Sequence, residues 1–453
     1  MGCVGWLDEF ATRRRILWLG WLLFVIYCYP GYMSTDSVDQ LLQARGINPM
    51  QDGHPPVMAL LWRLTDSIVA GPFPMLVIQS VAFLLGLDAI LRRVVQPRTA
   101  AIVASAMLVF PPLMTPMAVI WKDSQMAGFL LAGTACLLSD RRWIKVAGCA
   151  LLWLATAQRY NAVAATLPLV GGLFVWRGVI AGWRRYAIAC AVWLAISAAA
   201  FAANAALAEQ KMHAWHRSVA LMDIVGVVTF APELDDDEVR AALAGVTIVP
   251  RANLQRELRG AYNPHAWLWL VQGEGHVLEA PGTEAERDAV EHAWRTLVVT
   301  YPGAYVRHRG EVFATLLGLG HKRPDPEWAG FTDGPDQEQR IGQRAMHSAW
   351  QARWLRVIPA TKWLVIYRPW LYAVVGLVLL VLCRRDRLPA LIVTSGLVYE
   401  LGLFFAAPST DYRYSHWMMV CTTLAYAIAF ARRWQRGRGA RKPPADVASP
   451  TLA

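Results

Sequence analysis

Residues that suit group-transfer chemistry occur at several places far apart in the chain. They are Asp36, Asp39, His54, Lys122, Asp123, Arg159, Tyr160, Glu400, Asp411 and Arg413. A carboxylate can remove the proton from an attacking hydroxyl group. Cations beside it can stabilise a departing phosphate, whose negative charge grows in the transition state. If the fold brings these residues together, they indicate transfer of a group from a phosphate-linked donor.

The polar stretch 34–56 follows the first long apolar segment and carries three acids. We interpret Asp36 as the catalytic base and Asp39 as an acceptor-binding or orienting group. Asp52, which precedes a glycine, is typical of a turn. His54 is a candidate for substrate binding. The two prolines after it already explain a turn, so both roles stay open.

The composition indicates a polytopic helical membrane protein. The chain has 453 residues, of which 56% are hydrophobic and 17% charged, whereas about a quarter is charged in soluble proteins. The charge gathers in short Arg-rich runs beside apolar segments and in one long polar segment. The 21 Trp residues fit membrane interfaces, and they could equally stack on sugar rings. The net charge of +11 does not indicate nucleic-acid binding, because the positive runs flank apolar segments.

The Arg-rich runs also predict the topology. Three arginines at 13–15 precede the apolar run 16–32. Positive flanks stay in the cytoplasm, so the stretch 34–56 is expected outside. Continuing along the chain gives an all-α protein with about ten transmembrane helices and both termini in the cytoplasm. The predicted parts are a transmembrane module 1–208 with a first outer loop 33–72, an extracytoplasmic domain 209–358, a second transmembrane module 359–431 and a basic cytoplasmic tail 432–453.

Shorter helices that do not span the membrane are also predicted, and they would help to position the candidate residues outside it. The segment 55–71 is too short and too charged to span a membrane, so we expect an interfacial helix there. Within the polar segment 209–358, helical periodicity occurs at 236–243, 284–299 and 302–317. These segments predict a small helical domain outside the membrane.

This topology places the candidate residues at one membrane face. Arg159 and Tyr160 lie at an outer turn, and Glu400, about two-thirds of the way along its span, could line the same cavity. Asp88 is the contrast, because it lies one helical turn before Arg92 near the cytoplasmic end, where a local ion pair explains it. For any single outer residue, a role in capping a helix or pinning a loop remains an alternative.

The sequence resembles the GT-C superfamily of membrane glycosyltransferases. The likeness rests on five short motifs in residues 30–175 and 395–415. They are TDSVDQ with Asp36, the HPP that begins at His54, WKDS at 121–124, QRYNA at 158–162 and PSTDYRY at 408–414. Members of the superfamily have an acidic first outer loop, interfacial helices after it and a site outside the membrane. Their donors are polyprenyl-phosphate sugars.

The resemblance implies roles for individual residues. Asp36 matches the catalytic acid of the first loop, and Lys122 and Asp123 match the second outer loop. Arg159 and Arg413 fit contacts with the donor phosphate. Many members have two adjacent acids in the first loop, whereas Ser37 follows Asp36 here. We therefore predict no metal ion, and we predict no cofactor.

The predicted function is sugar transfer from a polyprenyl-phosphate donor to a glycan, lipid or protein acceptor in contact with membrane lipids. The predicted location is the bacterial inner membrane, with the active site on the periplasmic face. Two alternatives remain open. One is a transporter or flippase for an anionic lipid-linked substrate, which would use Arg159 and Glu400 in a central cavity. The other is a non-catalytic subunit of a glycan assembly complex.

Overall fold

The computed structural model describes residues 3–174, 182–319, 339–342 and 348–439. Within these ranges the regular structure is helical, and strand-like pairing is limited to isolated bridges between single residues. The all-α fold class predicted from the sequence is therefore confirmed.

The helices of the first half of the chain are joined by short connections. They are α1 (Cys3–Cys28), α2 (Thr35–Ala44), α3 (Pro56–Asp66), α4 (Phe73–Leu91), α5 (Pro97–Val109), α6 (Pro111–Ala118), α7 (Lys122–Leu137), α8 (Arg142–Gln158), α9 (Ala162–Leu173) and α10 (Trp183–Leu207).

The second half begins with shorter helices and ends with longer ones. They are a π-helical turn (Trp215–Val219), α11 (Ala220–Phe230), α12 (Asp236–Ala242), α13 (Leu254–Ala261), a 3₁₀ turn (Trp267–Leu270), α14 (Glu284–Thr300), α15 (Pro302–Leu316), α17 (Ala349–Thr361), a 3₁₀ turn (Val365–Tyr367), α18 (Pro369–Leu382), α19 (Arg387–Ala406), a 3₁₀ turn (Tyr412–Ser415) and α20 (His416–Gly439).

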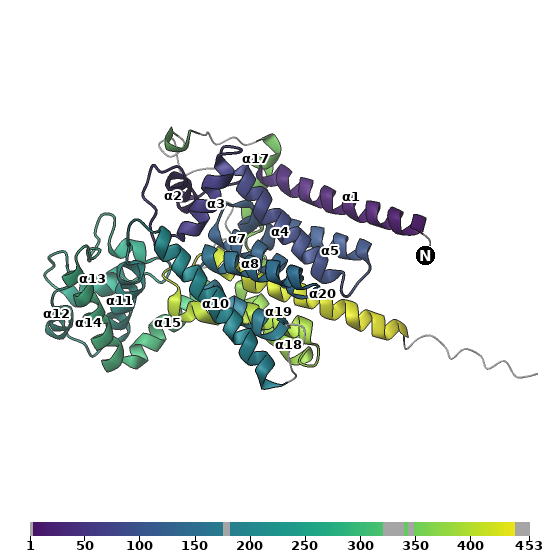
Figure 1. Ribbon diagram of the computed structural model, residues 1–453. Helices are drawn as coiled ribbons and strands as arrows, with labels where there is room; N and C mark the ends of the chain where they lie inside the picture. The colour runs from purple at the N-terminus through teal and green to yellow at the C-terminus, as the bar shows by residue number, and fades with distance from the viewer. Residues whose placement is uncertain (1–2, 175–181, 320–338, 343–347, 440–453) are drawn as a thin grey trace, which may run out of the picture.

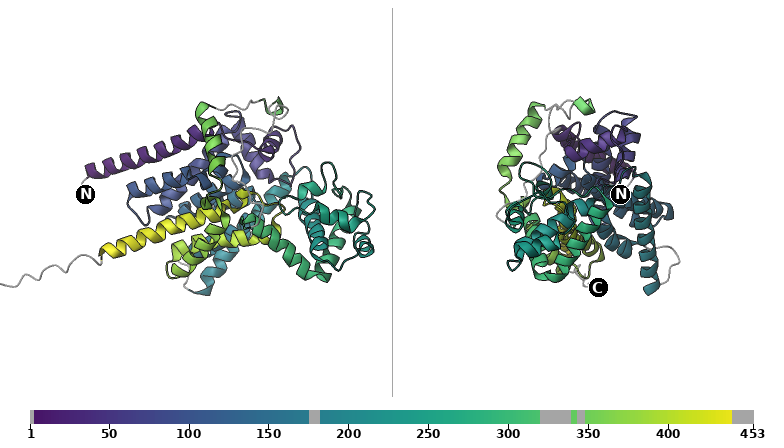
Figure 2. Two further views of the ribbon diagram at one scale, coloured as in Figure 1. Left: turned by 180° about the vertical axis from the view of Figure 1, so that it is seen from behind. Right: turned by 90° about the vertical axis from the view of Figure 1, so that its left-hand side faces the viewer.

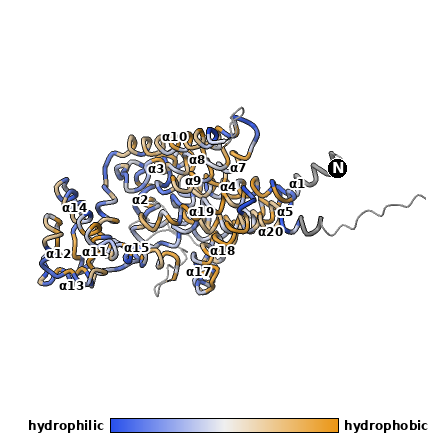
Figure 3. The backbone as a smooth tube through the Cα atoms, turned by 90° about the horizontal axis from the view of Figure 1, so that it is seen from below, coloured by the Kyte–Doolittle hydropathy of each residue, from blue (hydrophilic) through white to orange (hydrophobic). Residues whose placement is uncertain are grey.

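The helices form a bundle with a smaller group of helices at one end. Figure 1 shows α11 to α15 gathered at that end, while the N-terminus of α1 and the far end of α20 extend at the opposite end. The left view in Figure 2 shows the same separation from behind. Figure 3 shows hydrophobic residues along α10 and α18 of the bundle. We call α11 to α15 the outer helical group.

In the part of the chain that the structure describes, three helices are long and apolar enough to cross a membrane, namely α4, α10 and α19. The pair α5 and α6 would add a fourth, although it is bent by 67°. The bend lies at Phe110, where Pro111 begins the second helix and cannot donate a backbone hydrogen bond to the first. Length and composition therefore do not confirm the ten predicted spans.

Close packing fixes α7 against α4, and this matters because α7 begins with two candidate site residues. A Cβ atom at Gly86 would lie 2.7 Å from the backbone of α7, and one at Gly128 would lie 2.7 Å from the carbonyl oxygen of Gln79. Only glycine allows these helices to approach so closely. Gln79 also accepts a hydrogen bond from Gln125 of α7 (3.0 Å) and donates one to the Met117 carbonyl oxygen (2.7 Å).

Several local predictions agree with the structure. The expected interfacial segment contains α3, and the three periodic stretches of the polar segment correspond to α12, α14 and α15. Asp88 accepts from Arg92 (2.9 Å), as predicted, and also from Arg13 of α1 (2.6 Å). The stretch 34–56 differs from the simple loop we expected, because it contains α2. The predicted tail 432–453 begins inside α20, and residues 440–453 lie outside the described residues.

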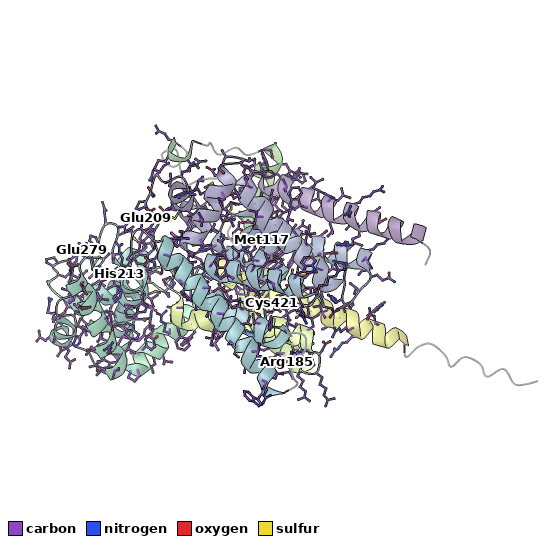
Figure 4. All side chains as sticks on the ribbon, viewed as in Figure 1. Met117, Arg185, Glu209, His213, Glu279 and Cys421 are labelled. Carbon is purple, nitrogen blue, oxygen red and sulfur yellow. The ribbon has the colours of Figure 1, made fainter. Side chains whose placement is uncertain are left out.

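The predicted segment 209–358 contributes to two places in the structure. The outer helical group contains its first helices, and Glu209 and His213 lie where this group meets the bundle (Figure 4). Helix α17 packs against α1 instead, where Gln351 donates a hydrogen bond to the Tyr29 carbonyl oxygen (2.6 Å).

A buried carboxylate organises the outer helical group. Asp223 of α11 accepts a hydrogen bond from Trp294 of α14 (2.8 Å) and lies 3.1 Å from His308 Nε2 of α15. It also pairs with the buried Arg309 (2.7 Å). Arg309 in turn donates to the Ala407 carbonyl oxygen at the end of α19 (2.9 Å). One ion pair thus joins the helices of the group to each other and to the bundle.

Replacing Asp223 by asparagine should therefore destabilise the protein. The Arg309 charge would stay buried without its counter-ion, which typically costs about 3–5 kcal/mol. Thermal unfolding of the purified protein in detergent measures the effect. The matched control is Glu291→Gln, because its pair with Arg295 (2.7 Å) is exposed and such pairs contribute at most about 1 kcal/mol. Equal melting temperatures for the two variants would contradict the assignment.

Candidate functional site

Asp36 lies in the first turn of α2, where the helix dipole favours a negative charge. Two hydrogen bonds fix this turn beside the segment that precedes α7. Ser37 Oγ donates to the Ile120 carbonyl oxygen (2.7 Å), and Trp121 Nε1 donates to Ser34 Oγ (2.7 Å). Asp36 is thereby held close to Lys122, which is the first residue of α7.

Three cationic or basic side chains face Asp36, whose side chain is 32% exposed. Arg413 Nη2 lies 2.8 Å from Asp36 Oδ2, and His54 Nε2 lies 3.9 Å from Oδ1. Lys122 Nζ lies 3.0 Å from His54 Nδ1. Four of the predicted residues, which come from three separate parts of the sequence, therefore form one cluster. We call these four residues the Asp36 cluster.

The charges of the cluster decide its protonation. Burial alone would raise the pKa of Asp36, but the positive charge of Arg413, with help from His54 and Lys122, holds it well below the usual range. Asp36 is thus ionised at neutral pH. Burial lowers the pKa of His54 to about 4, and the nearby Lys122 charge acts in the same direction. His54 is thus neutral there, and its Nδ1 can accept a hydrogen bond from Lys122.

Burial also lowers the pKa of Lys122 to about 8, although Asp36 opposes this shift. Lys122 therefore carries a positive charge at neutral pH and loses it in mildly alkaline solution. An ammonium group in this position can bind a phosphate oxygen as long as it stays protonated.

A second ion pair lies beside this cluster. Arg159, which is 6% exposed, donates to Asp123 Oδ2 (3.0 Å) and to the Tyr399 hydroxyl oxygen (2.9 Å). Its guanidinium lies 4.7 Å from the centre of the Tyr414 ring, and Arg413 lies 5.7 Å from the same ring. Tyr414 thus connects the Arg159–Asp123 pair to the Asp36 cluster through cation–π contacts.

Aromatic rings and a further acid hold Arg413 in place. Its guanidinium lies 4.6 Å from the centre of the Trp121 ring, and its Nη2 donates to Asp411 (3.0 Å). The backbone just before it is tied to the outer helical group, because Thr410 N donates to the His265 carbonyl oxygen (3.0 Å). The outer helical group therefore helps to position the main cation at Asp36.

Asp39 is held by partners within its own segment. Its carboxylate accepts hydrogen bonds from Gln43 (2.6 Å), Asn48 (2.8 Å) and Gln51 (2.9 Å). These bonds close the chain that follows α2. Asp39 thus shapes the segment that carries His54. This arrangement fits the orienting role among the two that we predict for Asp39, and its acceptor-binding role stays a prediction.

Tyr160 lines a separate groove together with Asp52, Phe201 and Lys211. Its ring stacks on Phe201, with 5.4 Å between the ring centres, and its hydroxyl donates to the Asp52 carbonyl oxygen (3.4 Å). Asp52 does more than form a turn, because its Oδ1 accepts from the Met212 backbone nitrogen (2.5 Å). The sequence could not reveal this contact, since 160 positions separate the two residues.

Glu400 lies on α19 next to Tyr399, the partner of Arg159. Its Oε1 accepts a hydrogen bond from Ser415 (2.7 Å), while its Oε2 is buried without a hydrogen-bond partner among the described residues. Glu400 is therefore held by the 3₁₀ turn that also contains Arg413.

The sequence reasoning missed the aromatic residues that hold the two arginines. Tyr399 and Tyr414 contact Arg159, and Trp121 contacts Arg413. Tyr414 and Trp121 stand directly beside predicted cations in the sequence, which was a usable signal. Tyr399 lies within an apolar segment, and nothing in its neighbourhood distinguishes it from a packing residue.

Asp36 borders a small cavity with room for about one water molecule. Its lining residues are Asp36, Ser37, Gln40, His54, Met58, Ile120, Trp121 and Lys122. Among the residues that the structure describes, no group of three or more His, Cys, Asp or Glu side chains is arranged to hold a metal ion.

No protein-family model, no curated protein and no solved structure matches this chain. The function of the site is therefore argued from its own geometry.

Replacing Arg413 by glutamine should raise the pKa of Asp36, because Arg413 is the largest influence that lowers it. Protonated carboxyl groups react with carbodiimides. Near pH 5 the labelling of Asp36, measured by peptide mass spectrometry, should rise about tenfold for each unit of pKa increase. The control is Arg45→Gln, which removes the partner of Asp66 (2.9 Å) and should not change labelling at Asp36. Equal labelling of Asp36 in wild type and Arg413→Gln would contradict this electrostatic account.

Proposed function

We propose that the protein is a polytopic membrane glycosyltransferase that uses Asp36 as its general base. In this proposal it moves a sugar from a polyprenyl-phosphate donor to a hydroxyl group of a glycan, lipid or protein. The observation that carries the proposal is the Asp36 cluster, in which one ionised carboxylate faces Arg413 at 2.8 Å with Lys122 nearby. A base and phosphate-binding cations in contact are what this reaction requires.

The membrane part of the proposal rests on the helices and on the distribution of arginine. Three helices are long and apolar enough to span, and α10 exposes most of its apolar surface. The N-terminal half of α1, which contains the arginines at 13–15, and the end of α20 extend at the end of the bundle opposite the outer helical group (Figure 1). With that end in the cytoplasm, the Asp36 cluster faces the periplasm of a bacterial inner membrane.

The reaction is a single displacement. Asp36 takes the proton of the acceptor hydroxyl while the oxygen of that hydroxyl attacks the anomeric carbon of the donor sugar. The bond between that carbon and the phosphate oxygen breaks, and its electron pair leaves with the polyprenyl phosphate. Attack and departure on opposite sides invert the anomeric configuration. Arg413 and Lys122 stabilise the charge that gathers on the phosphate.

The ion pair also suggests how donor and base act together. Arg413 lowers the pKa of Asp36, which makes the Asp36 carboxylate a weak base. A bound phosphate would share the positive charge of Arg413 and Lys122. The pKa of Asp36 would then rise toward the range in which a carboxylate removes protons well. Binding of the donor would therefore activate the base.

Transport is a second candidate, and one observation favours it. Glu400 lies in the apolar helix α19 with a buried oxygen that has no hydrogen-bond partner among the described residues. Ionisable groups inside membrane helices often line substrate paths. Transport would move a lipid-linked substrate unchanged, whereas glycosyl transfer makes a new product.

Replacing Asp36 by asparagine should abolish transfer, because the acceptor hydroxyl then has no base. Loss of a general base typically lowers the rate by about 10²–10⁴-fold. Transfer is measured with radiolabelled polyprenyl-phosphate sugars in membranes. The control is Asp66→Asn, a carboxylate of the neighbouring helix α3 that pairs with Arg45 and should leave transfer unchanged. Wild-type turnover by Asp36→Asn would exclude Asp36 as the base.

The affinity for the carrier phosphate should fall in alkaline solution. Lys122 has a pKa of about 8, so it is charged below this pH and neutral above it. Binding of undecaprenyl phosphate, measured by the rise in melting temperature, should weaken above about pH 8, by up to about tenfold per pH unit. Lys122→Arg keeps the charge and should remove this loss. If the affinity of Lys122→Arg for undecaprenyl phosphate fell in the same way above pH 8, a group other than Lys122 would be responsible and the prediction would be wrong.

A further inference from the structure

Gln40 lies one helical turn after Asp36 on the same face of α2. Its side chain is 2% exposed and lines the small cavity that Asp36, His54 and Lys122 also border. Gln40 therefore lines the same cavity as Asp36. It is not among the site residues predicted from the sequence, because its side chain carries no charge.

Both polar atoms of the Gln40 amide are buried without a hydrogen-bond partner among the described residues. Gln43, which is also buried on α2, is the contrast. Its Nε2 donates to Asp39 (2.6 Å), and its Oε1 accepts from the Gln51 backbone nitrogen (3.4 Å). An unpaired buried amide destabilises a protein. The two glutamines therefore differ. The Gln43 amide is paired within the fold, whereas the Gln40 amide is free to pair with a ligand group that enters the cavity.

We propose that the amide of Gln40 binds a hydroxyl group of the donor sugar and so selects which sugar is transferred. This inference rests on the proposed glycosyl transfer. A carboxamide presents one hydrogen-bond donor and one acceptor side by side, and a hydroxyl group can serve both. The cavity has room for about one water molecule, which is also the size of one hydroxyl substituent. The hydroxyl enters the cavity, and the rest of the sugar stays beside Asp36.

A single ordered water is the alternative occupant of the cavity. Such a water would also pair with the amide, but it would give Gln40 a structural role only. The two occupants differ in what they predict for a Gln40 variant. A sugar contact affects transfer in a way that depends on the sugar hydroxyl, whereas a water contact affects stability.

The experiment compares wild type, Gln40→Met and Gln43→Met. Methionine has nearly the length of glutamine and fills similar space. Transfer is measured with an undecaprenyl-phosphate sugar that wild type uses, and then with donors that lack one hydroxyl group each. Melting temperatures of the three proteins are recorded without ligand.

Gln40→Met should melt no lower than wild type, because it removes an unpaired buried amide. Gln43→Met should melt lower, because it removes two hydrogen bonds. With the full sugar, Gln40→Met should lower kcat/KM about 10–100-fold. One deoxy donor should be transferred equally well by wild type and Gln40→Met, and this donor identifies the hydroxyl group.

The outcomes separate the inference from the proposed function. If wild type transfers the sugar and Gln40→Met matches it with every donor, the Gln40 inference fails while the glycosyltransferase stands. If Gln40→Met only lowers the melting temperature, the water occupant is correct and the inference also fails. If wild type transfers no sugar from any donor, both the proposed function and the inference are overturned.

Discussion

An ion pair between Asp36 and Arg413 connects the first polar segment after α1 to the last one before α20. Nearly four hundred positions separate the two residues, so the whole fold must close correctly for them to meet at 2.8 Å. The pair also sets the chemistry, because Arg413 keeps Asp36 ionised and Asp36 keeps a cation at the place where a phosphate would bind. The remaining groups adjust this pair. His54 stays neutral, Lys122 adds a charge that mild alkali removes, and Tyr414 joins the pair to Arg159 and Asp123.

The scaffold is built so that both ends of this ion pair are fixed independently. On the Asp36 side, α2 is tied to the segment before α7, and α7 packs on α4 through glycines that allow backbone contact. On the Arg413 side, the residue Thr410 precedes the 3₁₀ turn Tyr412–Ser415. Its backbone nitrogen donates a hydrogen bond to the His265 carbonyl oxygen of the outer helical group. The Arg309–Asp223 pair anchors that group to the end of α19. The outer helical group therefore supports the site, in addition to any part it takes in recognising an acceptor.

Buried glutamines serve different purposes in this protein, depending on whether their amides have hydrogen-bond partners. Gln79 and Gln125 bond to each other and to backbone, which makes them part of the packing between α4 and α7. Gln40 has no such partners and borders the cavity at Asp36. Burial penalises an unpaired amide wherever it lies, and the amide of Gln158 is also unpaired among the described residues. The position of Gln40 at the cavity beside Asp36 is what makes a ligand its proposed partner. The distinction depends on the hydrogen bonds of each side chain, since these residues are all buried glutamines within helices.

The sequence by itself determined the helical fold class, three helices of the polar segment (α12, α14 and α15), the local pair of Asp88 with Arg92 and the charged residues of the candidate site. These depend on composition, periodicity and charges one turn apart, which are properties of neighbours in the chain. Only the tertiary structure decided which candidates meet. It joined Asp36, His54, Lys122 and Arg413, turned Asp39 and Tyr160 toward other partners, and added Tyr399, Tyr414 and Gln40. Contacts between distant segments depend on how the helices pack, and no local pattern records whether a buried side chain finds a partner there.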